Sequence, residues 1–78
     1  MYVKKELGET RFRKKLISLK TTRKRVLRES KDEIVIQRTL KKIGKTLRRM
    51  QGSWILDGHT RDLIVRFREV IQEDLSSS

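Results

Sequence analysis

The sequence predicts an all-α protein, a small compact bundle of three to five short helices. Apolar residues recur at intervals of three and four through most of the 78 residues, and no alternating pattern supports a strand. The chain has no proline and only four glycines, which suits helices that are not interrupted. Its length allows one domain, residues 1–78, with a single modest core. We expect residues 1–8 and 76–78 to be frayed ends of this domain.

The first third of the chain carries one apolar stripe, formed by Phe12, Leu16, Leu19 and Val26. Arg23 occupies the position at which this stripe lacks an apolar residue. The neighbouring Thr21 and Thr22 are weak helix formers. Together these residues predict a break, with one helix over about residues 9–20 and a shorter one near 22–29.

The middle of the chain contains the clearest helical period, formed by Ile36, Leu40, Ile43, Leu47 and Met50. Ser30 and Glu33 have the spacing of a capping box and predict the start of this helix. Residues 51–53, Gln-Gly-Ser, predict its end. Gly44 interrupts the pattern, so it either permits close helix packing or divides the segment in two.

A loop is expected over residues 51–59, and a last helix follows from about Thr60 to Leu75. Either Asp57 or Thr60 can supply the cap of this helix. Its apolar face consists of Leu63, Ile64, Phe67, Val70, Ile71 and Leu75.

Charge is distributed very unevenly along the chain, whose formal net charge is +11. Residues 1–28 carry +9, residues 29–53 carry +4 and residues 54–78 carry −2. Such an excess predicts a polyanionic partner: nucleic acid, an anionic membrane or an acidic peptide. No apolar run is long enough to span a bilayer or to form a signal peptide, and there is no cysteine. We therefore expect a soluble protein of a reducing, intracellular compartment, without a membrane partner.

Catalytic chemistry is not expected from this sequence, and no cofactor is predicted. His59 is the only histidine, and with Asp57 and Asp62 it could offer a nitrogen and two oxygens to a metal. A polar loop and a helix cap are the favoured interpretation of these residues, because one histidine without cysteine makes a poor metal site. The chain is predicted to be non-enzymatic.

The densest basic cluster lies between Lys20 and Arg28. It could contact phosphates, act as a nuclear-import signal, or form a solvated helix face without a partner. Few aromatic residues accompany the cations, so the cluster supports attraction to phosphates without reading of the bases. The residues of this candidate nucleic-acid surface are Arg11, Arg13, Lys14, Lys15, Lys20, Arg23, Lys24, Arg25 and Arg28.

Trp54, Ile55 and Leu56 give the predicted loop an unusually apolar centre. These side chains could fold back and close the end of the bundle, because large apolar residues are scarce in this chain. They could also anchor a partner, since tryptophan is enriched in interface hot spots. Both interpretations stay open at this point.

Two segments carry a resemblance to a known family. Residues 37–49 and 59–71 resemble the closing helices of the N-terminal domain of elongation factor TFIIS and elongin A. The integrase-binding domain of LEDGF is also similar, through residues 16–19, Thr22 and residues 39–43. The resemblance covers about residues 12–71 and implies a compact right-handed helical bundle that binds disordered, often acidic, motifs of transcription and chromatin proteins through its interhelical loops. The partner-binding residues that it implies, with the apolar loop, are Lys41, Lys42, Ile43, Trp54, Ile55 and Leu56.

Three functions are therefore weighed. The first is a nuclear protein-interaction module that docks short acidic and aromatic motifs of disordered protein segments. The alternative is a domain that binds DNA or RNA, with basic residues 11–28 contacting phosphates. A third is a self-associating helical protein whose small core is completed by a second chain, and the oligomeric state stays open.

Overall fold

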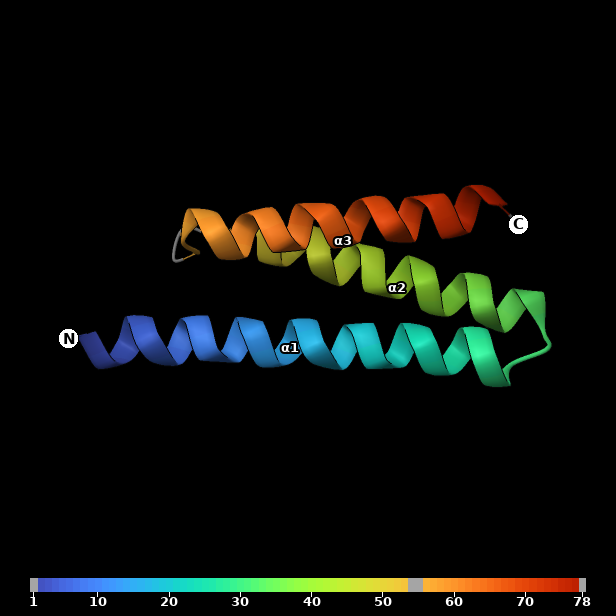
Figure 1. Cartoon of the computed structure of the whole chain (residues 1–78), viewed down its shortest axis with the longest axis horizontal. Coiled ribbons are helices and arrows are strands. Elements are labelled where there is room, and N and C mark those ends of the chain that lie inside the picture. Colours follow the sequence, from blue (N-terminus) through green and yellow to red (C-terminus); the bar gives the residue numbers. More distant parts are fainter. Residues whose placement is uncertain (1, 54–55, 78) are drawn as a thin grey trace.

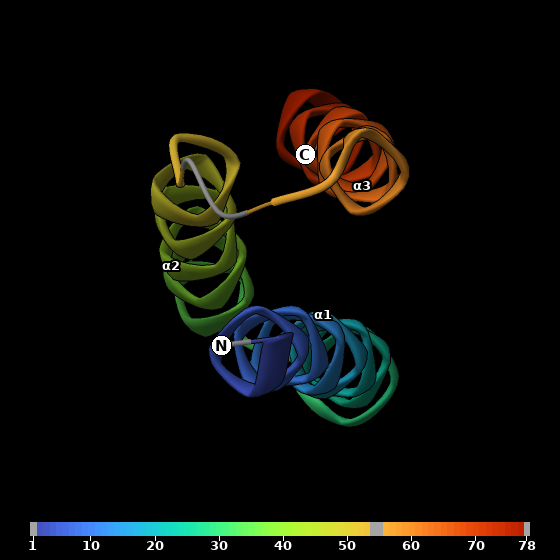
Figure 2. The same ribbon diagram turned by 90° about the vertical axis from the view of Figure 1, so that its left-hand side faces the viewer.

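The described residues form a bundle of three helices in which each helix is antiparallel to the next, and the predicted all-α fold is confirmed (Figure 1). The computed structural model describes the backbone of residues 2–53 and 56–77 and the side chains of residues 11–53 and 56–77. The helices are α1 (Tyr2–Glu29), α2 (Glu33–Gln51) and α3 (Gly58–Ser77). Seen end-on, they form a triangle in which α2 and α3 lie on the same side of α1 (Figure 2). The bundle is elongated, with principal extents of 46 × 19 × 15 Å.

Helix α1 is continuous, so the predicted break between residues 20 and 22 is wrong, as is the predicted start near residue 9. The hydroxyls of Thr21 and Thr22 donate to the backbone oxygens of Ile17 and Ser18, at 3.0 and 2.9 Å. These bonds to the preceding turn satisfy both hydroxyls within the helix, so the two threonines do not interrupt it.

The predicted capping role of Ser30 is also wrong, because Asp32 is the N-cap of α2. The backbone N–H of Ser30 still donates to the carbonyl of Val26, at 3.1 Å, and so belongs to the last turn of α1. Asp32 has extended backbone angles and accepts from the N–H of Ile34 through Oδ1, at 2.9 Å. Its carbonyl accepts the first helical bond, from the N–H of Ile36 at 3.1 Å.

Helix α2 passes through Gly44 without interruption. A Cβ atom at Gly44 would lie 3.7 Å from Cγ2 of Ile71, an ordinary van der Waals distance. The packing of α2 on α3 therefore leaves room for a methyl group at this glycine. The helix ends at Gln51, as predicted, and the N–H of Gly52 caps it by donating to the carbonyl of Arg48, at 3.3 Å.

Of the two candidate caps of α3, Asp57 fills the role. Its Oδ1 accepts from the N–H of Thr60 at 2.6 Å, and its carbonyl accepts from the N–H of Arg61 at 3.0 Å. The helix begins at Gly58 and continues through Ser77, beyond the predicted end at Leu75.

Helices α2 and α3 supply most of the core, and they also share the most extensive interface. The buried apolar side chains are Leu16 and Leu19 of α1, Leu40, Ile43, Leu47 and Met50 of α2, Leu56 of the connection, and Ile64, Phe67 and Ile71 of α3. The stripes predicted for α2 and α3 are thus the packed faces. Residues 11–29 of α1, the longest helix, contribute only Leu16 and Leu19 to the buried side chains.

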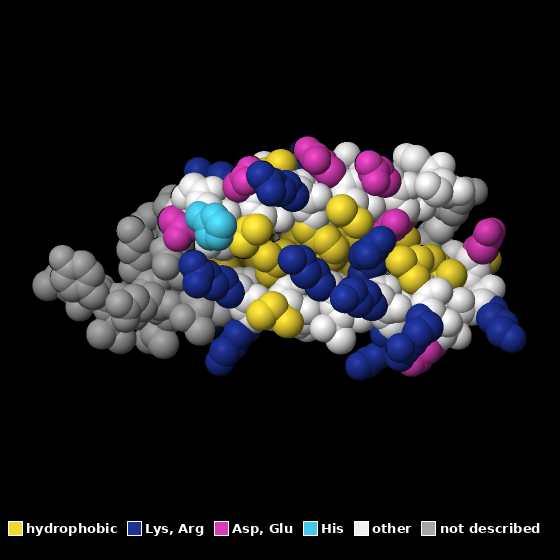
Figure 3. Space-filling view, in the orientation of Figure 1, with side chains coloured by type: hydrophobic (Ala, Val, Ile, Leu, Met, Phe, Trp, Pro, Cys, Tyr) yellow, Lys and Arg dark blue, Asp and Glu magenta, His cyan; other side chains and the backbone are white. Residues whose placement is uncertain are grey.

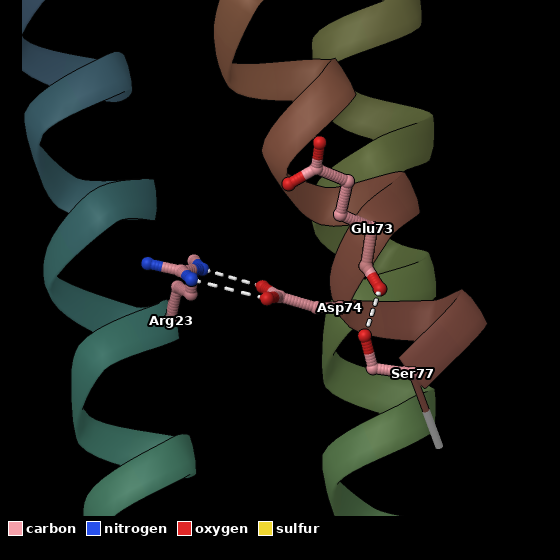
Figure 4. Close-up of polar contacts among 4 residues, drawn as sticks. All are labelled: Arg23, Glu73, Asp74 and Ser77. Carbon is pink, nitrogen blue, oxygen red and sulfur yellow. Dashed lines mark hydrogen bonds and ion pairs between the residues drawn. The ribbon is translucent and has the colours of Figure 1, made fainter.

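Two charged side chains of α1 contact α3 directly. The guanidinium of Arg23 donates twice to the carboxylate of Asp74, at 2.5 and 3.1 Å (Figure 4). These side chains are 25% and 19% exposed, and the hydrogen bond to Asp74 raises the pKa of Arg23. One turn away, Nζ of Lys20 lies 5.9 Å from the centroid of the Phe67 ring. The position that breaks the apolar stripe of α1 is therefore filled by an interhelical ion pair.

Candidate nucleic-acid interface

The apolar members of the predicted peptide-docking set belong to the core wherever the structure describes them. Ile43 is 2% exposed and Leu56 is 6% exposed. Both pack in the hydrophobic cluster, so neither offers a side chain to a partner in this conformation. Trp54 and Ile55 lie outside the described residues.

Lys41 and Lys42, the basic members of that set, are exposed on the outer side of α2. They lie next to the core residue Leu40 in the chain, and the helical turn directs them away from it. The four described members of the docking set therefore separate into two lysines at the surface and two apolar residues in the interior.

The predicted nucleic-acid surface, by contrast, lies on one continuous helix. Its exposed members on α1 are Arg11, Arg13, Lys14, Lys15, Lys20, Lys24, Arg25 and Arg28. Between residues 11 and 28 there is no Asp or Glu. A break in the helix would have pointed these cations in different directions, whereas the continuous helix aligns them along its length.

Arg23 is the exception within this set. It is half-buried and its charge is neutralised by Asp74, so it ties α1 to α3. Arg28 lies 3.6 Å from Glu29, but both side chains are largely exposed, and such a pair contributes little.

A second basic surface on α2 was only partly predicted. It lies opposite the buried stripe of this helix and consists of Arg38, Lys41, Lys42, Lys45, Arg48 and Arg49, all exposed. The signal for it was present in the sequence, because these positions fall between the members of the clearest apolar stripe. Within α2, only Glu33 carries a negative charge.

Most of these cations have no partner within the part of the chain that the structure describes. The cations of α1 without a hydrogen bond, ion pair or ring contact to a described residue are Arg11, Arg13, Lys14, Lys15, Lys24 and Arg25. On α2 the same holds for Arg38, Lys41, Lys42, Lys45, Arg48 and Arg49. We refer to these two groups together as the free basic surface.

The arginines of α3 behave differently, because each has a partner. Arg61 donates to the carbonyl of Ser53 at 3.3 Å, and Arg68 donates to Oε1 of Gln51 at 2.6 Å. Arg66 pairs with Asp62 of its own helix, at 3.2 Å. Arg61 and Arg68 thus join α3 to residues 51–53, whereas Arg66 is paired within its own helix.

Figure 3 shows the resulting charge separation on one face of the molecule. Lys and Arg side chains gather over α1, whereas Asp and Glu side chains gather mainly over α3, with apolar side chains between the two helices. The acidic residues of α3 are Asp62, Glu69, Glu73 and Asp74.

Asp57, His59 and Asp62, the candidate metal ligands, are a helix cap and two exposed side chains. The carboxylate of Asp57 accepts from the N–H of Thr60, and His59 and Asp62 are exposed. Among the described residues there is no group of three or more His, Cys, Asp or Glu side chains that could hold a metal ion. Within the same residues, no helix has the length and apolar character needed to cross a membrane.

No family model, no curated protein and no solved structure matches this chain. The resemblance to the TFIIS and LEDGF domains therefore stays a prediction from the residues that carry it.

Proposed function

We propose that this protein is a non-enzymatic nucleic-acid-binding domain that holds phosphates on the free basic surface of α1 and α2. The observation that carries this proposal is the contrast between the helices. The arginines of α3 are all paired, while six cations on α1 and six on α2 have no partner among the described residues.

Unpaired cations on one side of a small domain repel one another and oppose folding. A polyanion removes this repulsion, and the displacement of its condensed counterions favours binding. Nucleic acid suits the length of the surface, because α1 alone is about 42 Å long at 1.5 Å per residue. Phosphates spaced along a strand could therefore face cations along most of the helix.

Docking of acidic peptides is the less supported function. It requires an apolar pocket for an anchor residue beside the charged rim. The described apolar residues of that proposal, Ile43 and Leu56, are core residues. Lys41 and Lys42 remain accessible, and they serve the nucleic-acid proposal equally well. A nuclear location is consistent with either proposal and stays a prediction.

The test is the salt dependence of binding to a fluorescently labelled DNA duplex, followed by anisotropy. If about six phosphates are contacted, the affinity should fall roughly 1,000-fold between about 50 and 200 mM monovalent salt. Poly-glutamate of similar length is the competitor that represents an acidic protein segment. Displacement of the duplex by poly-glutamate at equal charge concentration would contradict the proposal, as would absence of duplex binding at low salt.

A matched pair of variants places the contact on the proposed helix. Arg25→Gln and Arg66→Gln each remove one exposed arginine, the first from α1 and the second from α3. Arg25→Gln should lower the magnitude of the salt slope by about 1, while Arg66→Gln should leave it unchanged. Equal effects of the two substitutions would mean that net charge alone governs the binding.

A further inference from the structure

One line of side chains runs down the side of α1 that faces away from the bundle. Lys14, Ile17, Thr21, Lys24 and Arg28 follow one another at intervals of three or four residues, so they share one face of the helix. All five are exposed. Because α2 and α3 both pack on the opposite side of α1, neither of these helices covers this line (Figure 2).

Cations stand on both sides of this line. Lys20 lies on the side of α3, since its Nζ contacts the ring of Phe67. Arg25 lies on the side of α2, since it borders a shallow depression together with Val26 and Thr39. At about 100° per residue, Arg13 falls on the same flank as Lys20. The free side of α1 therefore has two basic flanks and a mixed central line.

Ile17 is the most exposed large apolar side chain of the described chain, at 64%. Single exposed apolar residues are common on protein surfaces, so the exposure of Ile17 does not by itself indicate a contact. Its position among the cations of α1 is the informative feature. Ile17 lies next to the hydroxyl-bearing Thr21 on a face whose other long side chains are mostly cations. The exception is Leu27, which is 41% exposed and borders one depression with Thr21 and Lys24. The hydroxyl of Thr21 donates to the carbonyl of Ile17, which leaves the threonine methyl group free at the surface.

We propose that α1 lies in the major groove of duplex DNA, with Ile17 and Thr21 against the base edges and the two flanks on the phosphates of opposite strands. This inference rests on the proposed function and names its ligand. The major groove is about 12 Å wide and admits one helix of about 10–12 Å diameter. Apolar side chains at the base edges contact the methyl group of thymine, so the complex should prefer thymine-containing sites.

An RNA duplex does not offer the same fit. Its A-form major groove is deep and too narrow for a helix, and uracil has no methyl group. Binding to RNA would use phosphates alone, without a role for Ile17. The preference for DNA over RNA therefore has two sources, the wider major groove of DNA and the contact of Ile17 with thymine.

The experiment measures affinities of the full chain for three duplexes of one A/T-rich sequence at constant salt. They are DNA with thymine, the same DNA with deoxyuridine, and RNA. The variants are Ile17→Ser and the control Ile34→Ser, which removes an isoleucine that is 62% exposed on α2. Ile17→Ser should weaken binding to thymine DNA about fourfold or more, the effect of one buried methyl or methylene group. Ile34→Ser should not change it.

Deoxyuridine should weaken binding of the parent by a similar factor but leave that of Ile17→Ser unchanged. Circular dichroism of both variants controls for folding, which exposed positions should preserve. Equal binding of DNA and RNA, or equal effects of the two serine variants, would overturn the inference. The proposed function would still stand if duplex binding depended on salt. Loss of all duplex binding by the parent would overturn both.

Discussion

Helix α1 and the α2–α3 pair differ in how many apolar side chains they bury and in whether their cations are paired. The pair contributes seven of the ten apolar residues that are buried among those described, and the cations of α3 are used in hydrogen bonds and ion pairs. Residues 11–29 of α1 bury Leu16 and Leu19 and leave a long basic side in solvent. Helix α2 combines the two properties, because its inner side is apolar and buried and its outer side is basic and exposed.

This difference teaches that stability and binding are separable here. Substitutions at the α2–α3 interface should act on the free energy of unfolding. Substitutions on the outer side of α1 should act on affinity for an anion and leave the fold intact. Four stability measurements can break or sharpen this division.

The largest effect is expected from Leu40→Ala in α2, where the side chain is 1% exposed. The loss of packing should cost about 2–5 kcal/mol of unfolding free energy, a large part of what so small a domain has. Leu19→Ala in α1, with 8% exposure at the edge of the core, should cost near the lower end of that range. Urea denaturation followed by circular dichroism measures both. Equal losses would show that α1 is as deeply integrated as α2.

The ion pair between α1 and α3 should give the next effect. Asp74→Asn removes the charge that accepts both hydrogen bonds from Arg23 and should cost about 1–2 kcal/mol. Glu73→Gln is the matched control, because Glu73 is the exposed neighbour of Asp74 and should change stability by less than about 0.5 kcal/mol. The same denaturation assay applies, and an Asp74 variant as stable as its control would mean that the pair does not hold α1.

At the junction of α1 and α2, the choice of cap can be tested directly. Asp32→Ala should destabilise the protein by about 1 kcal/mol, because the N–H of Ile34 loses its acceptor. Ser30→Ala should cost less than about 0.5 kcal/mol, since it removes only a side chain without a capping role. Thermal melts of both variants decide between them. If Ser30→Ala were the more destabilising of the two, Ser30 would be the cap of α2.

The smallest expected change is a gain. Gly44→Ala should stabilise the protein by about 0.5–1 kcal/mol, because alanine favours the helix and its methyl group would meet Ile71 at 3.7 Å. A rise in the melting temperature is the measurement. A loss of stability would instead show that α2 and α3 approach too closely for a side chain at this position.

The fold could be predicted where the sequence contains local periodicity. The stripe from Ile36 to Met50 marked the buried side of α2, and Asp57 was a recognised cap of α3. Continuity of α1 was not predictable in the same way. Arg23 looked like a break in an apolar stripe because its partner, Asp74, lies 51 residues later in the chain.

The basic surface was predicted only in part, because its geometry also depends on contacts between residues far apart in the chain. A run of cations between residues 11 and 28 is visible in the sequence, whereas their alignment depends on the unbroken helix. Ile43 was chosen as a partner contact by resemblance although it belongs to the apolar stripe of α2, and Leu56 was chosen from the apolar loop, for which folding back was the other possibility. The structure shows that both side chains are buried. Trp54 and Ile55 lie outside the described residues, so their role stays a prediction.

The weak contact between α1 and α3 has a consequence for the order of folding. Helices α2 and α3 are neighbours in the chain and share the largest interface, so they can form a native hairpin before α1 joins it. We expect α1 to dock last. Leu47→Ala should then slow folding, whereas Leu16→Ala should mainly accelerate unfolding, a difference that stopped-flow kinetics can measure. A nascent chain would thus carry its most charged helix undocked until the other two were complete.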